Sequence, residues 1–344
     1  MKNTTKRPKV LFLTRLFYPH IGGVETHVGK ISHLLVNMGF EITIITEHYD
    51  ENLKTHEALD GINIYRIPIK NSDKNKKFEI WKWMITHREM IKNHDVIHIH
   101  DVFFWILPLF FILDRKKIFT TFHGYESYPV SISSKIQKKI AAKFSKGNIV
   151  VGEFIKKWFG ITSNAVIYGG VDLPSITANE AKRAHKILNI LYIGRLSCDM
   201  ASLEYEKTLK KLKKNGVSFN LVVCGEGEFR NKYEKIGNVV GFVTDLDKYI
   251  EKTDIVFSSS YLAMLQVMMQ KKPIFAIYDN PLKEDYLKKS PFEKYISVNS
   301  SGEALYRQIK NNKMYELPIE DGYIWAKSQT WVKVAENYKS LWKI

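Results

Sequence analysis

The chain has 344 residues, of which 45% are hydrophobic and 13% aromatic. This length and composition predict two globular domains with sizeable cores and argue against disorder. The 52 Lys and Arg residues outnumber 36 Asp and Glu, which gives a formal net charge of +16. Such an excess is typical of proteins that meet nucleic acid, anionic membranes or anionic small substrates, and equally of solvated lysine-rich faces.

Cysteine usage and hydropathy exclude further classes. Cys198 and Cys224 are far apart and lack metal-ligand spacing, so neither a disulfide framework nor a zinc site is expected. The first ten residues contain no apolar signal core, which predicts a cytoplasmic protein. The longest apolar run, residues 102–113, is interrupted by Pro108 and is too short to cross a bilayer.

Strand-like and helical runs alternate along the first half of the chain. We expect strands over residues 9–14, 40–46, 62–69, 95–100, 117–122, 148–151 and 165–168, and helices over residues 28–38 and 78–92. The run at 62–69 has the pattern of a strand near an edge. Repeated strand and helix units of this length predict a parallel doubly wound sheet.

The pattern breaks at residues 173–186, which are polar, include a proline and predict a linker. Beyond it, strands are expected over residues 187–193, 219–224, 238–243, 255–258 and 273–277, with a charged helix that ends at Lys214. Two consecutive α/β units predict two Rossmann-like domains that face each other across a cleft. Ligands of such sheets bind beyond the carboxyl ends of the strands, where most of the Gly, His and Arg residues in this sequence fall.

A Gly-Gly pair follows the first predicted strand. Gly22 and Gly23 precede a helix, and this arrangement directs free backbone N–H groups and a positive helix end toward an anion such as a phosphate. A tight turn without a ligand is the alternative. Farther along, His98, His100 and Asp101 form an HxHD pattern that suggests a metal, but no other ligand cluster accompanies it.

Seven short motifs occur in a definite order. They are GGVETH at 22–27, HIHD at 98–101, TFHGYE at 121–126, IYGGVD at 167–172, YIGRLS at 192–197, CGEGE at 224–228 and GFV at 241–243. With this order and spacing the chain resembles the family 4 glycosyltransferases of the two-domain GT-B architecture. The resemblance implies an acceptor-side domain over 1–172, a linker over 173–186, a nucleotide-sugar domain over 187–325 and a terminal helix over 326–344 that returns to the first domain.

The resemblance also implies an activity. Family members transfer a sugar from a nucleotide-diphosphate donor, here of UDP or GDP type, to a glycan or lipid-linked acceptor, with retention of configuration and without an obligatory metal or cofactor. They serve polysaccharide or glycoconjugate biosynthesis, often at the inner face of the membrane. Phe103, Phe104, Trp105, Phe110 and Phe111, with Trp81, Trp83 and the lysines within 74–77, are therefore a candidate membrane-facing patch. The alternative is a buried helix over 102–113. No nucleic-acid recognition motif is apparent, and the oligomeric state is not predicted.

Site residues follow from the same motifs. Arg195 would neutralise the diphosphate, because a guanidinium is always charged and binds phosphate with two hydrogen bonds. His123 would lie beside the donor sugar and the attacking hydroxyl, or else only bond a loop carbonyl. The predicted catalytic residues are His123, Arg195 and Gln266; the donor-binding residues are Gly22, Gly23, Arg195, Gly225, Glu226, Gly227, Val243, Ser260 and Gln266; the acceptor-side residues are Glu25, His27, His98, His100, Asp101, Tyr125 and Glu126.

The second domain departs from the family where the donor would bind. Met200 stands where the resemblance implies a lysine that pairs with the arginine, and Gln266 replaces the second of two glutamates whose first member is deleted. One interpretation is a working transferase with a remodelled donor site that uses Arg195, Gln266, Asp279 and Ser260 differently. A second is a degenerate binding or partner subunit, and a third is a nucleotide-sugar epimerase of the same architecture. A substitute cation close to Arg195, such as Lys207 or another neighbour, would favour the first.

Overall fold

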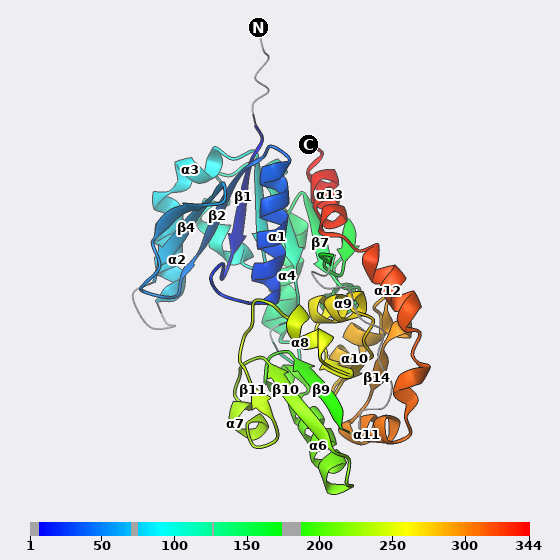
Figure 1. The fold of residues 1–344 in the computed structure, drawn as a ribbon. Coiled ribbons are helices and arrows are strands. Elements are labelled where there is room, and N and C mark those ends of the chain that lie inside the picture. Colours follow the sequence, from blue (N-terminus) through cyan, green and yellow to red (C-terminus); the bar gives the residue numbers. More distant parts are fainter. Residues whose placement is uncertain (1–6, 70–74, 126, 174–186) are drawn as a thin grey trace. The chain divides into compact units, whose positions relative to one another are not determined.

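The computed structural model describes residues 7–69, 75–125, 127–173 and 187–344. By compactness the chain divides into unit 1, Met1–Ile167 with Trp331–Ile344, and unit 2, Tyr168–Thr330. The boundaries therefore fall a few residues from the predicted positions 172 and 326. Apart from Leu173, the predicted linker lies outside the described residues. Each unit is described by itself below, and its elements are labelled in Figure 1.

Unit 1 is built on an eight-stranded sheet with the order β3-β4-β2-β1-β5-β6-β7-β8. The strands are β1 (Lys9–Thr14), β2 (Glu41–His48), β3 (His56–Leu59), β4 (Ile62–Pro68), β5 (Val96–His100), β6 (Ile118–Phe122), β7 (Gly147–Val151) and β8 (Ala165–Ile167). All neighbours pair in parallel except β3 and β4. Thr14 is in register with His100, so the carboxyl ends of β1 and β5 lie side by side at the point where the strand order reverses.

Helices of unit 1 follow the sheet and include one from the far end of the sequence. They are α1 (Gly23–Asn37), α2 (Lys76–Thr86), α3 (Arg88–Lys92), α4 (Ile132–Phe144), α5 (Phe154–Phe159) and α13 (Trp331–Trp342), with 3-10 turns η1 (Phe103–Leu109) and η2 (Arg115–Lys117). Figure 1 shows α13 beside α1, and the two helices pack together. The terminal helix thus belongs to the first compact unit.

Three parts of unit 1 differ from the sequence prediction. β3 was not expected, and it makes β4 the inner strand of an antiparallel edge pair. The single helix predicted over 78–92 is interrupted at His87, whose backbone leaves the helical region between α2 and α3. The run over 102–113 forms the short turn η1, with Phe103 and Trp105 buried but Phe111 98% exposed. Neither a wholly buried helix nor a wholly exposed aromatic patch is therefore correct.

Unit 2 is built on a six-stranded parallel sheet with the order β11-β10-β9-β12-β13-β14. The strands are β9 (Leu188–Ile193), β10 (Phe219–Cys224), β11 (Asn238–Val239), β12 (Ile255–Ser258), β13 (Ile274–Ile277) and β14 (Ser297–Asn299). Counted within the unit, this is the 3-2-1-4-5-6 order of dinucleotide-binding folds. Its switch point lies between β9 and β12, where a ligand crevice is expected beyond the carboxyl ends.

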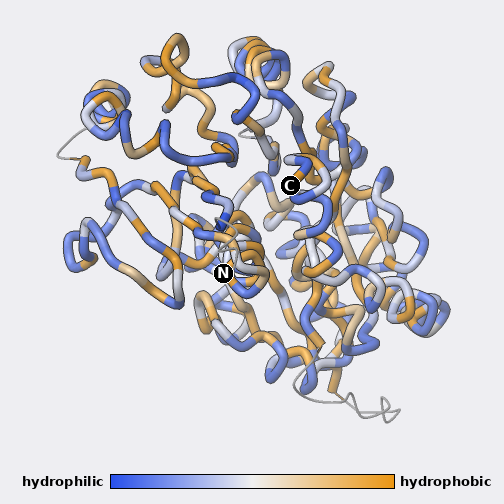
Figure 2. The backbone as a smooth tube through the Cα atoms, turned by 90° about the horizontal axis from the view of Figure 1, so that it is seen from above, coloured by the Kyte–Doolittle hydropathy of each residue, from blue (hydrophilic) through white to orange (hydrophobic). Residues whose placement is uncertain are grey.

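The helices of unit 2 pack around an aromatic core. They are α6 (Ser202–Lys214), α7 (Arg230–Tyr233), α8 (Asp247–Glu251), α9 (Tyr261–Met269), α10 (Pro281–Lys288), α11 (Gly302–Lys310) and α12 (Ile319–Lys327), with turns η3 (Cys198–Met200), η4 (Glu293–Tyr295) and η5 (Lys313–Glu316). Tyr192, Tyr205 and Tyr233 are buried together with Phe257 and Phe275. In Figure 2 apolar stretches are orange, whereas many connecting loops are blue. This is the pattern that burial of the strands requires.

Candidate functional site

A chain of hydrogen bonds joins the end of the sequence to the sheet of unit 1. The indole Nε1–H of Trp342 donates to His98 Nδ1 at 2.9 Å. Neutral imidazole has one proton, so His98 Nε2–H donates to the Thr121 hydroxyl at 2.7 Å. Among the described contacts of Thr121 only the Tyr338 hydroxyl, at 2.9 Å, remains to accept its proton. Tyr338 then donates to His27 Nε2 at 2.9 Å. Because indole can only donate, the proton positions along this chain are determined.

A second pair of histidines lies beside this chain, at the ends of β5 and β6. His100 Nδ1 lies 2.8 Å from His123 Nε2, and the His27 and His123 ring centroids are 4.9 Å apart. Asp101 accepts the backbone N–H of His123 at 3.0 Å and the Lys138 ammonium at 3.1 Å. Asp101 therefore holds the loop after β6, in which His123 is only half-buried. The structure thus brings together five of the predicted residues, which are His27, His98, His100, Asp101 and His123.

Burial keeps these histidines neutral. It lowers the pKa of His27, His98 and His100 well below the usual value, and mutual repulsion with His123 adds to the effect. Burial also lowers the pKa of His123 to about 3, helped by the Lys138 ammonium. At neutral pH His123 is therefore uncharged, and because His100 engages its Nε2, its Nδ1 is the ring nitrogen that can donate or accept a further hydrogen bond.

The Gly-Gly turn lies at the start of α1. Gly22 is the N-cap in extended conformation, and Gly23 begins the helix. The carboxylate of Glu25 lies against Gly22 and 3.0 Å from His20 Nδ1, so an acidic group of the chain already faces this helix start. Tyr125 lies in the loop after β6, two residues beyond His123, with its ring centroid 6.1 Å from that of Phe154. Glu126 lies outside the described residues.

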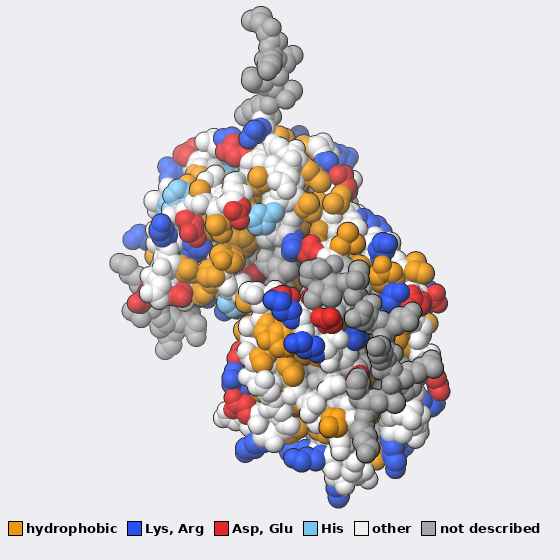
Figure 3. Space-filling model, viewed as in Figure 1, with side chains coloured by type: hydrophobic (Ala, Val, Ile, Leu, Met, Phe, Trp, Pro, Cys, Tyr) orange, Lys and Arg blue, Asp and Glu red, His pale blue; other side chains and the backbone are white. Residues whose placement is uncertain are grey.

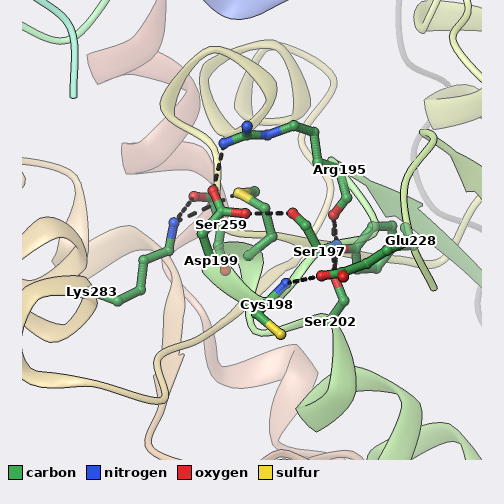
Figure 4. Close-up of polar contacts among 10 residues, drawn as sticks. Arg195, Ser197, Cys198, Asp199, Ser202, Glu228, Ser259 and Lys283 are labelled. Atoms are coloured by element: carbon green, nitrogen blue, oxygen red, sulfur yellow. Dashed lines mark hydrogen bonds and ion pairs between the residues drawn. The ribbon is translucent and has the colours of Figure 1, made fainter. Parts of the chain in front are cut away.

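In unit 2, Arg195 follows β9 in a loop that is held by buried hydroxyl groups. The hydroxyls of Tyr192 and Ser202 donate to the Arg195 carbonyl at 2.9 and 3.1 Å. The Arg195 guanidinium is 64% exposed and lies 2.5 Å from Asp199. Ser197 also donates to Asp199, as Figure 4 shows. The loop therefore presents an oriented guanidinium on a fixed backbone.

The glycine-rich loop after β10 is interlocked with the Arg195 loop. The backbone N–H of Leu196 donates to the Glu226 carbonyl at 2.8 Å. A Cβ on Gly225 would clash with the carbonyl of Gly194, and one on Gly227 with the carbonyl of Leu196. Glycine is required here because the two backbones touch. The side chain of Glu226 forms an ion pair with Arg230.

The remaining predicted donor residues are held by other contacts. The Gln266 amide donates to Asp247 at 2.9 Å, and Gln270 donates to the same carboxylate at 2.8 Å. Ser260 is the N-cap of α9 without a side-chain capping bond. Val243 lies in the loop after β11 and is half-buried. The described contacts do not link Gln266 to the Arg195 loop.

Two parts of the site were not foreseen from the sequence. Tyr338 and Trp342 lie in the terminal helix that was expected to return to the first domain, but their hydrogen bonds to Thr121 and His98, more than 200 positions away, were not predicted. Lys283 is buried and donates to the Ser259 carbonyl at 2.9 Å, with its Nζ 3.9 Å from Met200 Sδ. The only sequence signal for Lys283 was the expectation of some substitute cation near Arg195.

Two features of the described residues bear on alternative kinds of site. No group of three or more His, Cys, Asp or Glu side chains in them has a metal-binding arrangement. None of their helices combines the length and apolar character needed to cross a membrane. On the face shown in Figure 3, Lys and Arg side chains are scattered among Asp and Glu rather than gathered in one stripe.

Comparison with known sequences shows which proteins this chain resembles. Residues 21–174 match the family model described as Glycosyltransferase Family 4. The chain is 23% identical to an uncharacterised glycosyltransferase of Methanocaldococcus jannaschii, over 98% of this chain and 99% of the relative. A stretch covering 19% of this chain and 14% of the relative is 29% identical to one of the subunits of human phosphatidylinositol N-acetylglucosaminyltransferase.

Solved structures share the fold over nearly the whole chain. Sucrose-phosphate synthase from Thermosynechococcus elongatus has a TM-score of 0.76 at 13% identity and covers 98% of each chain. An Anabaena protein solved with UDP and glucose has a TM-score of 0.69 at 13% identity, over 97% of this chain and 99% of its own. These findings confirm the predicted fold class and family resemblance. The chain is a glycosyltransferase-like protein with the GT-B fold, and it resembles family 4.

Proposed function

We propose that this protein transfers a sugar from a nucleotide-diphosphate donor of UDP or GDP type to a glycan or lipid-linked acceptor, with retention of configuration and without an obligatory metal. The observation that carries the proposal is the exposed Arg195 guanidinium on an interlocked glycine loop at the switch point of the second sheet. The likeness to a GT-B structure solved with UDP and glucose supports a donor of this class.

In this reaction unit 2 would stabilise the departing diphosphate. Negative charge grows on the leaving oxygen as the sugar bond breaks, and an oriented cation lowers the energy of that state. Arg195 suits this task because its backbone is fixed by Tyr192 and Ser202 while its guanidinium faces solvent. Gly225 and Gly227 let the two loops lie in direct contact, which helps to fix the backbone that carries Arg195.

In this reaction unit 1 would orient the attacking hydroxyl of the acceptor and the donor sugar. His123 is neutral and half-buried, and its ring is held by His100 and its backbone by Asp101. It therefore serves as a hydrogen-bonding group rather than a cation. We expect His123→Ala to lower the transfer rate while the affinity for the free nucleoside diphosphate stays unchanged. Equal losses of rate and nucleotide affinity would contradict this role.

Isothermal titration of the full chain with UDP, GDP and ADP tests the donor class. We expect one of them to bind, and Arg195→Ala to weaken that binding by about tenfold or more, since a charge-assisted phosphate contact contributes about 1.5–3 kcal/mol. Arg307→Ala is the matched control, because Arg307 is an exposed arginine of unit 2 paired with Glu303. It should leave the affinity unchanged.

The degenerate partner subunit remains the second candidate function. It is favoured by Gln266, which stands at a position of the paired-glutamate motif and is bound to Asp247. A folded protein that binds none of the three nucleotides, or that binds one but neither hydrolyses nor transfers its sugar conjugates, would support it. Transfer from any of the sugar conjugates would exclude it.

We further propose that unit 1 meets an anionic membrane surface through α4 rather than through the aromatic run alone. Ile132, Ile136 and Ile140 are spaced four residues apart and exposed by 76%, 51% and 40%. The ring of Phe144, at the end of this helix, contacts Phe110, next to the exposed Phe111. Lysines and arginine flank the stripe at positions 139, 143, 115 and 116. Apolar side chains with basic neighbours fit the interface of anionic lipids.

Sedimentation with vesicles tests this surface. We expect the protein to bind vesicles that contain phosphatidylglycerol more than vesicles of phosphatidylcholine alone. The double variant Phe111→Ser, Ile136→Ser should lose this binding. Ile324→Ser is the matched control, because Ile324 is a 64% exposed isoleucine of unit 2. Equal binding of both variants would refute the proposed surface.

A further inference from the structure

The loop that presents Arg195 has a second cation beside it, which comes from a different element. Lys283 lies in the first turn of α10, after β13, and is 2% exposed. Its Nζ lies 3.9 Å from the sulfur of Met200, at the end of the Arg195 loop, although the two residues are 83 positions apart. Figure 4 shows the Arg195 and Lys283 side chains directed toward the region where Asp199 lies.

The partners of this ammonium are electrically neutral. Lys283 donates to the Ser259 carbonyl at 2.9 Å, and its Nζ lies 4.2 Å from the centroid of the Tyr286 ring. The third contact is the thioether of Met200. Within the described part of the chain, no carboxylate comes within 4.0 Å of the ammonium. A buried cation without a counter-ion is costly, and a bound anion would relieve that cost.

The electrostatics agree with the geometry. Burial lowers the pKa of Lys283 to about 8, and Arg195 lowers it too, while Asp199 and Asp279 act in the opposite direction. The Arg195 and Lys283 cations are therefore close enough to repel each other, which is the arrangement expected of two cations that bind a single polyanion. At neutral pH Lys283 still carries its charge.

We propose that Lys283 binds the diphosphate of the donor together with Arg195, and so replaces the cation that Met200 does not provide. This inference rests on the proposed function. The main competing explanation is that the ammonium only caps the Ser259 carbonyl at the end of β12. Of the two roles, only diphosphate binding predicts a selective loss of affinity for phosphorylated ligands.

The occupied start of α9 supports this assignment. The backbone N–H of Tyr261, the first residue of α9, is bonded to the Tyr286 hydroxyl at 3.1 Å. The rings of Tyr261 and Tyr286 stack with centroids 3.9 Å apart. This N–H is therefore engaged by a side chain instead of facing a phosphate, so the positive groups of Arg195 and Lys283 must supply more of the binding.

Calorimetric titration of four full-length proteins tests the proposal: the unchanged protein, Lys283→Met, the exchange variant Met200→Lys, Lys283→Met, and the control Lys288→Met. Lys288 is an exposed lysine of the same helix, paired with Glu284 at 2.7 Å. Each is titrated with the nucleoside, monophosphate and diphosphate of the base that the unchanged protein binds. We expect Lys283→Met to weaken the diphosphate by ~10–100-fold and the nucleoside by less than ~2-fold. The exchange variant should recover most of the loss.

A measurement on the unchanged protein does not depend on how the variants fold. The quantity to measure is the ratio of the diphosphate affinity to the nucleoside affinity, in which ionisation of the base cancels. This ratio should fall as the pH rises above about 8, because Lys283 is then neutral in the free protein and must take up a proton to bind the diphosphate. The inference is overturned if the diphosphate-to-nucleoside ratio is the same in Lys283→Met and the unchanged protein, or if it does not change with pH. Failure of the unchanged protein to bind any nucleoside diphosphate would overturn the proposed function as well.

Discussion

Acid should destabilise unit 1 through four histidines, of which His27, His98 and His100 are buried and His123 is half-buried. His27, His98, His100 and His123 all have pKa values depressed by burial, so they remain neutral in the folded state while they accept protons in the unfolded chain. His98 is especially resistant, because the Trp342 indole N–H occupies its Nδ1 and would face a second N–H after protonation. Groups with lowered folded-state pKa values of this kind favour folding above the unfolded pKa, near 6.5, and lose that contribution as the pH falls.

The size of the effect follows from the number of groups. Between pH 7.5 and 5.5, a histidine that stays neutral when folded and titrates near 6.5 when unfolded loses about 1.4 kcal/mol of folding free energy. Four such residues lose at most about 5.5 kcal/mol together, which is comparable with the whole stability of many domains. For a unit of this size the melting temperature should fall by about 10–20 °C.

Urea unfolding at the two pH values measures this loss. Tryptophan fluorescence reports mainly on unit 1, because all of the seven tryptophans except Trp325 lie there. His98→Gln should reduce the pH dependence by about a quarter of the total, since one of four titrating groups is gone. His33→Gln, at an exposed position of α1, should leave it unchanged. Equal unfolding free energies at pH 7.5 and 5.5 would refute the reasoning.

Three further changes have expected outcomes. Tyr338→Phe leaves the buried His27 imidazole and Thr121 hydroxyl without their partner and should lower the urea-unfolding free energy by about 1–3 kcal/mol. An unchanged unfolding free energy would mean that these hydrogen bonds add no stability. Gly225→Ala should destabilise unit 2 by about 1–3 kcal/mol in thermal unfolding, because its Cβ meets the Gly194 carbonyl; an unshifted melting temperature would contradict this. Asp199→Asn should strengthen diphosphate binding up to about fivefold in calorimetry, since the carboxylate competes for Arg195, and weaker binding would show that Asp199 positions the guanidinium instead.

The inner strands could be predicted from the sequence because each is a short apolar run. β10 and β12 have the predicted bounds, and β1 does too. The edge strands β3 and β14 were missed, because they have only four and three residues and their stability comes from pairing with a neighbour. Local sequence contains little information about such pairings.

In the candidate site, too, features set by local sequence could be predicted and contacts between distant residues could not. Arg195 and Gly225 lie in motifs whose spacing along the chain reflects strand ends, so their placement near each other could be predicted. Lys283 could not be placed, because its partners are distant in sequence and no motif contains it. Trp342 was expected on the first domain as part of the terminal helix, but its partner His98 could not be predicted. The contact of Gln266 with Asp247 was also beyond prediction, since it depends on how α8 packs against α9.

The position of α13 has a consequence for synthesis. Unit 1 is discontinuous in sequence, and its histidine chain needs Tyr338 and Trp342, which the ribosome makes only after all of unit 2. During translation, the first 167 residues of unit 1 cannot complete their fold, because the imidazoles of their sheet still lack these two partners. Unit 2 is continuous in sequence and can fold as soon as it leaves the ribosome. The order in which the two units mature should therefore be the reverse of the order in which their first residues are made.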